Sequence, residues 1–342
     1  MLRLFVPSLD LTNTLSFAET LNGEILDKEV ILDFSRMGHV EPLPMLIMGS
    51  NIRAFIDSHP EIEFKTEGID ADFKHHYVGT MGFFKYISES IEIGKRPGEA
   101  RGSNNYIPIK AIMVNELKKK EPSNLALGEL LEKEAGNLAT VLDRGNTEIH
   151  KLLTYLIREV LRNIPEHAKT DIMWICGQYW PSKGISKIAI VDEGIGIFRS
   201  ITQNLSHREY ITDYSTALQW ALRAGISEAF NPSSQNKSQN DWANSGFGLY
   251  MVSEICRSLG GSFCIVSYEN YLQVDKQGLK TGRAYFHGTA IEMEVPTEKV
   301  LNARKLISQT LAQGEKEART IRNAFKTAST PSRGLLEDLN IQ

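Results

Sequence analysis

The sequence predicts an α/β (α+β) protein of two domains. The small N-terminal domain has a crossover helix, and the larger C-terminal domain places helices on one face of a mixed, mostly antiparallel sheet. The length of 342 residues exceeds one average domain of roughly 150 residues. A strand, helix and strand order near the N-terminus, and a later series of helices and apolar strands, predict the two architectures.

The N-terminal prediction depends on three segments. Residues 29–34 (Glu-Val-Ile-Leu-Asp-Phe) are typical of a short buried strand, and residues 43–56 carry apolar side chains in a helical rhythm. Residues 61–64 are typical of another strand. We therefore expect a small α/β domain over residues 1–93.

The remaining boundaries follow from changes in composition. Residues 94–105 are rich in glycine, proline and small polar residues and predict a loop. We expect residues 94–146 to be a loop and partly helical connector, or the opening element of the second domain. The second domain is expected at 147–296, and 297–342 is expected to be a helical tail to about residue 326 with a loose end. Within the second domain we expect helices at 147–164 and 248–259 and strands at 171–176, 187–191, 262–268 and 289–295.

Charge and composition exclude several partners. A net charge of -4 and a pI near 6.1 give no basic surface for nucleic acid. Apolar runs fall short of the roughly 20 residues that cross a bilayer, and Pro7 and Asp10 interrupt a signal-peptide pattern, so we expect no membrane association. Three cysteines without a C-x-x-C pair indicate buried thiols and a cytoplasmic protein.

The helix before Pro165 carries two polar residues on its apolar stripe. Leu152, Leu156, Glu159 and Asn163 follow steps of four, three and four, which place them on one face. In one interpretation the stripe reaches the surface and Glu159 pairs with a neighbouring basic residue. In the other, the Asn163 amide oxygen binds a magnesium ion carrying phosphates, and Glu159 orients or deprotonates a water.

An apolar strand at 188–191 ends at Asp192-Glu193-Gly194-Ile195-Gly196. The alternating glycines permit a sharp turn and the close approach of a flat ligand. The Asp192 carboxylate can accept a hydrogen bond from the exocyclic amine of adenine, which guanine lacks at that position. The alternative is a simple strand-to-turn connection with Asp192 as an Asx-turn residue.

A second glycine pair, Gly246 and Gly248, opens a helix whose apolar residues recur at three and four. Free N–H groups and the positive end of the helix dipole favour phosphate at such a turn, although glycine also occurs at ordinary helix starts. Residues 227–244 are rich in Ser, Asn and Gln and are expected to form a mobile loop that closes over phosphates.

In this order, Glu159-x-x-x-Asn163, Asp192-x-Gly194-x-Gly196, Gly246-x-Gly248-Leu249 and Gly288-Thr289 resemble the N, G1, G2 and final-threonine boxes of the GHKL superfamily of ATPases and histidine kinases. The resemblance covers about residues 147–296. It implies a Bergerat-type α/β sandwich that holds ATP and Mg²⁺.

The resemblance also implies a role for each matching residue. Asn163 would bind magnesium, Asp192 adenine, and Thr289 would assist at the adenine through water. The glycines of both loops with Leu249 would contact the nucleotide, and His167 would lie near the phosphates. Pro165 departs from the pattern, because proline ends or kinks a helix that many relatives continue.

The N-terminal domain resembles, more faintly, the STAS domains of anti-anti-sigma factors, with residues 31–35 as its central strand exit. Phosphoswitched relatives carry a serine before the following helix, where this chain has Val40-Glu41-Pro42-Leu43-Pro44. The resemblance implies a protein partner that binds through the N-terminal domain, without a phosphoacceptor there.

Three functions remain open from the sequence. They are an ATP hydrolase or ATP-driven switch, a protein serine kinase of the anti-sigma type, and a nucleotide-binding module without turnover. A conventional histidine kinase is disfavoured because none of the eight histidines precedes the nucleotide domain in a phosphoacceptor helix, His75 and His76 lying in a predicted strand or turn. The sequence leaves a homodimer open.

Overall fold

The computed structural model describes the chain except for residues 24, 26, 70–72, 121–123, 231–244 and 335–342. It is a mixed α/β protein with one parallel sheet and one antiparallel sheet, ordered β1-β2-β3 and β4-β5-β6-β8-β7. In the described part of the chain, no helix combines the length and the apolar character that a bilayer crossing requires.

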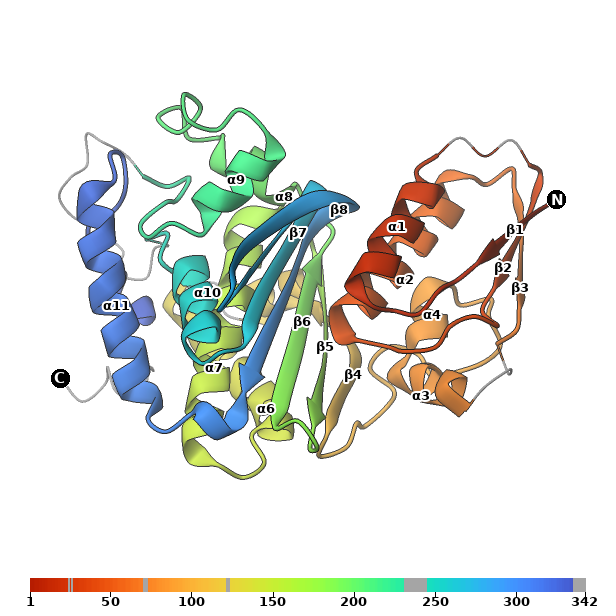
Figure 1. Ribbon diagram of the computed structural model, residues 1–342, viewed down its shortest axis with the longest axis horizontal. Helices are drawn as coiled ribbons and strands as arrows, with labels where there is room; N and C mark the ends of the chain where they lie inside the picture. Colours follow the sequence, from red (N-terminus) through yellow and green to blue (C-terminus); the bar gives the residue numbers. More distant parts are fainter. Residues whose placement is uncertain (24, 26, 70–72, 121–123, 231–244, 335–342) are drawn as a thin grey trace.

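The N-terminal unit is a three-stranded parallel sheet with its helices on one side (Figure 1). Its elements are β1 (Leu2–Phe5), α1 (Leu11–Leu21), β2 (Glu29–Asp33), α2 (Pro42–Ser58), β3 (Glu63–Glu67), α3 (Phe73–Met81) and α4 (Phe83–Ile87). Parallel neighbours need a crossover, and α1 and α2 supply the two crossovers. The predicted strand or turn at His75 and His76 is wrong, because both residues lie in helix α3.

The C-terminal unit builds the larger sheet and the helices on one face of it. Its first part is β4 (Tyr106–Met113), α5 (Val114–Lys120), α6 (Asn124–Leu142), α7 (Thr147–Asn163), η1 (Ile164–Ala168), β5 (Ile172–Trp180) and β6 (Ile185–Asp192). Its second part is α8 (Gly196–Ile201), α9 (Tyr214–Ala221), α10 (Gly248–Ser258), β7 (Ser262–Asp275), β8 (Gly278–Pro296), η2 (Thr297–Lys299), α11 (Ala303–Thr320) and η3 (Pro331–Arg333). Every neighbouring pair in this sheet is antiparallel.

Two segments add to or differ from what the sequence predicts. The described part of residues 106–142, expected as a partly helical connector or an opening element, forms edge strand β4 and helices α5 and α6, and Ile107, Leu131 and Leu138 enter the core of the C-terminal unit. The expected loose end at 328–332 packs against the protein, with Ser332 only 3% exposed. Its partners are polar groups on distant helices, which local composition does not reveal.

The N-terminal unit covers the second face of the larger sheet, so α1 and α2 lie between the two sheets (Figure 1). Strand β6 shows why this face is apolar: Ile188 and Ile190 enter the core under α7, whereas Ala189 and Val191 enter a core shared with α2. Alternate side chains of a strand point to opposite faces. A continuous apolar run therefore fits a strand that is covered on both sides.

Polar contacts also join the units. Lys187 Nζ lies 2.9 Å from Glu41 Oε2, and Glu292 Oε2 accepts the backbone N–H of Leu43 at 3.2 Å in the first turn of α2. Ser50 and Arg53 of α2 both donate to Glu193 Oε1. The three cysteines are buried, as expected.

Candidate functional site

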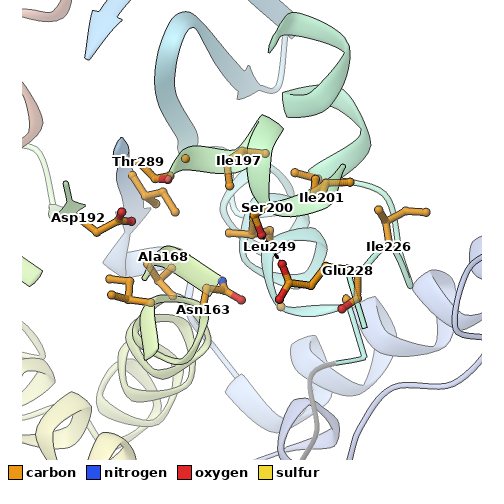
Figure 2. A pocket seen from close by; sticks show the side chains of 18 of the residues that line it. Asn163, Ala168, Asp192, Ile197, Ser200, Ile201, Ile226, Glu228, Leu249 and Thr289 are labelled. Carbon is orange, nitrogen blue, oxygen red and sulfur yellow. Dashed lines mark hydrogen bonds between the residues drawn. The ribbon is translucent and has the colours of Figure 1, made fainter. Parts of the chain in front are cut away.

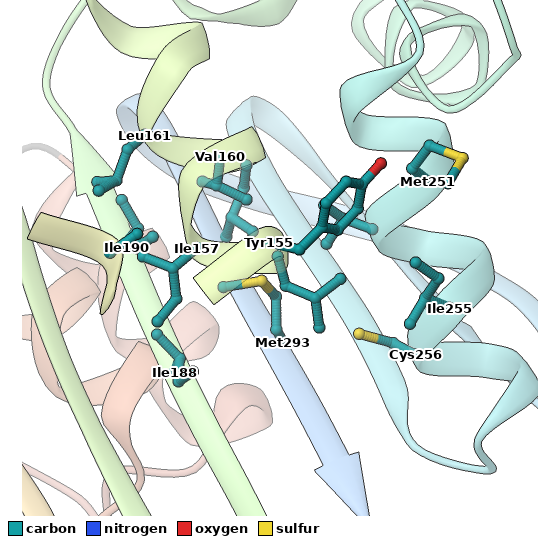
Figure 3. Packing of buried hydrophobic residues seen from close by; sticks show 14 of the residues in the cluster. Tyr155, Ile157, Val160, Leu161, Ile188, Ile190, Met251, Ile255, Cys256 and Met293 are labelled. Atoms are coloured by element: carbon teal, nitrogen blue, oxygen red, sulfur yellow. The ribbon is translucent and has the colours of Figure 1, made fainter. Parts of the chain in front are cut away.

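Helix α7 places Asn163 at the edge of a cavity. The Asn146 side chain caps its start by accepting from the N–H groups of Glu148 and Ile149. Its apolar side chains pack on β6, β8 and α10, as Figure 3 shows. The α-helical part ends at Asn163 and continues as one π-helical turn. Pro165 lies in this turn, and its lack of an N–H explains the change of pitch.

A pocket opens at this end of α7 and encloses about 760 Å³ of empty space, including the part open to solvent. Figure 2 shows Asp192 and Thr289 at one end of it, Asn163, Ser200 and Glu228 toward the middle, and Ile201 and Ile226 at the other end. Apolar side chains form most of the wall between these groups. They are Val160, Ile164, Ala168, Ile190, Ile197, Ile201, Ala221, Ile226, Leu249 and Ile291.

Asp192 ends strand β6, where it pairs in register with Thr289 of β8. Its Oδ1 atom accepts the N–H of Gly194 at 2.9 Å. The residue is 4% exposed, and this burial raises the pKa of the carboxyl to about 7 against the opposing hydrogen bonds from Gly194 and Thr289. Gly194 and Thr289 are both uncharged donors, so a ligand donor in the pocket can still bind the carboxylate.

The first glycine turn lies directly on the π-helical turn. A Cβ atom on Gly194 would stand 2.0 Å from the carbonyl oxygen of Ala168, closer than real contacts allow. The next residue, Ile195, donates its N–H to that same oxygen at 2.9 Å. Glycine at 194 therefore permits the contact that brings Asp192 and Asn163 to one pocket.

The second glycine turn begins α10. Gly246 has a φ of 71°, and a Cβ atom there would stand 2.2 Å from the carbonyl oxygen of Ile226. Its carbonyl oxygen accepts the N–H of Gly225 at 3.1 Å. Gly248 is the first residue of α10 and lines the pocket with Gly246 and Leu249, so the N-terminus of this helix faces the cavity.

Glu159 lies beside the pocket and does not line it. Its carboxylate is 2% exposed, with Oε1 2.9 Å from Arg158 Nη2 and Oε2 2.8 Å from the hydroxyl of Ser332. A Cβ on Gly248 would lie 3.2 Å from Glu159 Oε2, so Gly248 separates the carboxylate from the cavity. Burial favours the neutral acid, but the charges of Arg158 and Arg162 outweigh it and lower the pKa of Glu159.

The structure brings most residues of the sequence prediction to one cavity. The pocket is lined by Asn163, Asp192, Gly196, Gly246, Gly248, Leu249 and Thr289. Gly194 and Glu159 do not line it: Gly194 packs against the Ala168 carbonyl, and Glu159 lies behind Gly248. The side chain of His167 and most of the loop expected at 227–244 (residues 231–244) lie outside the described residues.

Sequence reasoning missed two polar residues of the wall. Ser200 of α8 donates to Glu228 Oε2 at 2.8 Å, and both line the pocket. Ser200 lies in helix α8, whose six residues are too few to show an apolar period. Glu228 lies in a polar stretch that shows no period either. The available signal for Ser200 was its position four residues after Gly196, whereas Glu228 lies 18 residues before Gly246 and had no such signal.

The wall offers oxygen ligands but no ready-made metal cluster. Among the residues that the structure describes, no group of three or more His, Cys, Asp or Glu side chains is arranged to hold a metal ion. A hard cation here would take oxygens from a ligand as well as from the protein. Comparisons with protein families, with curated proteins and with solved structures gave no match to this chain.

Proposed function

We propose that this chain is an ATP- and Mg²⁺-binding regulatory protein of the GHKL type, in which nucleotide binding or hydrolysis switches contacts with a protein partner. One observation carries the proposal. The buried carboxylate of Asp192 and a glycine-rich helix N-terminus face the same apolar pocket, with Asn163 between them. An adenine nucleotide needs an acceptor, a flat apolar slot and a phosphate site in this order.

Adenine would lie at the Asp192 end. Its exocyclic amine donates to the carboxylate, while Thr289 and Gly194 hold that carboxylate in place. Above the Asp192 pKa of about 7, guanine would present an oxo group there and set two acceptors against each other without a proton between them. Leaving a buried acceptor unpaired costs about 1–3 kcal/mol, which supports discrimination of adenine from guanine.

The phosphates would lie toward Gly246 and Gly248, where the first N–H groups of α10 are available to an anion. The Asn163 amide oxygen would hold the magnesium ion together with phosphate oxygens and water, a ligand set that this cation prefers. When bound, the ion neutralises phosphate charge. The chain's own contribution is the position of Asn163, set by the end of α7.

The architecture is consistent with this assignment. Helices α6, α7 and α10 cover one face of the larger sheet, as a Bergerat-type sandwich requires (Figure 1). The parallel three-stranded unit is consistent with an α/β domain of STAS type. Its helices α1 and α2, however, pack on the larger sheet of the same chain. A protein partner would then meet its remaining surface.

A binding module without turnover is the second candidate, and the contacts of Glu159 favour it. A general base must reach the proton that it removes, but both oxygens of this carboxylate already have partners. Phosphotransfer to a protein partner, as in anti-sigma kinases, is the third reaction to test. It would transfer label from γ-labelled ATP to that partner.

The test is calorimetric titration of the full chain with ATP, ADP and GTP, with and without magnesium, followed by a phosphate-release assay. We expect ATP and ADP to bind and GTP to bind much more weakly. Asp192→Asn should remove the binding of both adenine nucleotides, with Asp213→Asn, at an exposed helix start, as the matched control. Equal affinity for ATP and GTP would contradict the proposed role of Asp192.

A further inference from the structure

A short C-terminal segment lies across the outer side of α7 at Glu159. We call residues 328–334 the C-terminal strap. The Ser332 hydroxyl donates to Glu159 Oε2 at 2.8 Å, and the Ser332 carbonyl accepts from the Tyr155 hydroxyl at 2.9 Å. Arg158 Nη2 donates to the carbonyls of Pro331 and Gly334 at 2.6 and 3.0 Å. The strap therefore binds both Glu159, the candidate general base, and Arg158, the cation that is paired with it.

The strap also reaches the second glycine turn. Its Ser329 N–H donates to the Ser245 hydroxyl at 2.7 Å, and Ser245 directly precedes Gly246. Just before the strap, the Phe325 N–H donates to the Gly225 carbonyl at 2.9 Å. Because Gly225 is itself bonded to Gly246, the same segment restrains both the carboxylate and the proposed phosphate turn.

The strap is attached mainly by polar contacts. Its buried apolar groups are small, Ala328 and Pro331, so apolar burial contributes little to its attachment. Glu315 of α11 fixes it further, by accepting from the Ala328 N–H at 3.2 Å and from Arg333 at 3.0 Å. Water can replace these polar partners, at a cost that is larger for the bonds to charged groups than for the neutral ones. Detachment therefore breaks polar bonds and exposes little apolar surface, so α7 and α11 keep their packing on the core.

We infer that the C-terminal strap is an autoinhibitory element, which keeps Glu159 away from the nucleotide while it is attached and permits turnover when it detaches. This inference rests on the proposed nucleotide site. In the step that it controls, a water oxygen bonds to the γ-phosphorus while the bond from that phosphorus to the β–γ bridging oxygen breaks. ADP leaves, and the water proton passes to the Glu159 carboxylate.

The physical basis is competition for one carboxylate. Arg158 donates to Oε1 of Glu159 and Ser332 to Oε2, and Oε2 is the oxygen that lies 3.2 Å from the Cβ position of Gly248 at the pocket wall. Detachment of the strap removes Ser332, the donor to Oε2. It also removes two carbonyl acceptors of Arg158, those of Pro331 and Gly334. The carboxylate can then turn toward a water near the glycine turn.

The experiment measures ATP binding and steady-state phosphate release in four full-length variants and one truncation. Ser332→Ala removes the bond to Glu159, and Ser332→Asp adds repulsion. Ser308→Ala, on the exposed side of α11, is the matched control. Glu159→Gln is combined with Ser332→Ala, and a chain ending at Thr327 lacks the strap.

A hydrogen bond to a charged group favours its bonded state by about tenfold or more, so we expect Ser332→Ala to raise phosphate release about tenfold at saturating ATP. Ser332→Asp and the truncation should raise it at least as much, and the added Glu159→Gln should abolish the gain. Ser308→Ala should match the parent chain.

The two proposals fail differently. If none of the proteins binds ATP, the proposed function is wrong. If ATP binds but release stays at the parent rate in Ser332→Ala, Ser332→Asp and the truncation, the strap has only a structural role. A lower melting temperature with unchanged release would lead to the same conclusion, and so would a gain that survives Glu159→Gln.

Discussion

Two buried carboxylates, one in the wall of the pocket and one behind Gly248, have opposite surroundings. Asp192 is 4% exposed and Glu159 2%, so burial does not distinguish them. Asp192 accepts from a backbone N–H and a hydroxyl, and its pKa is raised to about 7. Glu159 is paired with Arg158 beside Arg162, and its pKa is lowered.

The difference shows what prepares a buried acid for a ligand. A carboxylate with neutral donors remains costly to ionise, so a further donor from a ligand stabilises it. A carboxylate that already has a cation gains little from another donor. In this state of the molecule, Asp192 is therefore prepared to bind, and Glu159 is held by its partners.

The largest effect is expected from Arg158→Met. The side chain of Arg158 is 1% exposed and bonds to Glu132 and Glu159, so its removal leaves Glu159 buried with Arg162 3.7 Å away as the remaining cation. We expect a loss of about 3–5 kcal/mol in the free energy of unfolding, measured by urea denaturation. The double variant with Glu159→Met should recover much of it, and a double variant as unstable as the single one would argue against the pairing.

Asp192→Asn tests the other carboxylate. We expect the affinity for ATP to fall at least about 100-fold, since the ligand amine would meet either an amide donor or an oxygen already used by Gly194. The fold should be retained. Because the folded-state pKa is raised, wild-type Asp192 costs stability as the pH rises from the ordinary carboxyl pKa of 3.8 to about 7, where the loss is complete. The asparagine variant should consequently melt furthest above wild type at pH 8, with a smaller difference at pH 5.

The pH dependence of binding sharpens the same contrast. Below the pKa of about 7, Asp192 carries a proton and no longer accepts well from the adenine amine. Affinity should then fall by up to about tenfold for each pH unit. Adenosine is the proper probe, because it has no phosphate that titrates in this range. A flat profile from pH 8 to 5.5 would show that the Asp192 carboxylate is not the acceptor.

The smallest effect is expected from Glu193→Gln. This neighbour of Asp192 faces α2, where it accepts from Ser50 and pairs with Arg53. The pair is partly exposed, with 22% and 36% of the two side chains accessible, so its loss should cost under about 1 kcal/mol. Adenosine affinity should change less than about threefold at pH 8. A larger loss would mean that the N-terminal unit helps to position Asp192.

The sequence predicted elements whose apolar pattern is strong. The strands β2 and β6 and the helices α2, α7 and α10 lie within a few residues of their expected ranges, because each buries a regular stripe or run. The sequence did not predict strand β4 within residues 94–146, because β4 is an edge strand that leads directly into a helix. Helix α3 was missed because His75 and its neighbours lack a clear helical stripe.

The candidate site was predictable as a set of motifs, and its partners were not. Glycine turns and a polar residue on an apolar stripe are local signals, so Asp192, Asn163 and Gly246 could be named as candidates, and the structure places all three at one pocket. The contact between Glu159 and Ser332 spans 173 residues of sequence, and the strap resembles any polar tail in composition. Pairing of Glu159 with a neighbouring basic residue was one of the two interpretations of the sequence, and the structure confirms it with Arg158, but only the folded chain shows Ser332 on the same carboxylate.

The apolar core between α2 and strand β6 determines how the two units of the protein unfold. Val191 is buried in it directly before Asp192, so strand β6 cannot lose the N-terminal unit without exposing apolar surface next to the proposed adenine acceptor. The two sheets should therefore unfold in one transition. A nucleotide bound on one side of the larger sheet would then protect the backbone amides of the distant parallel sheet as well, through mass action on the folded state.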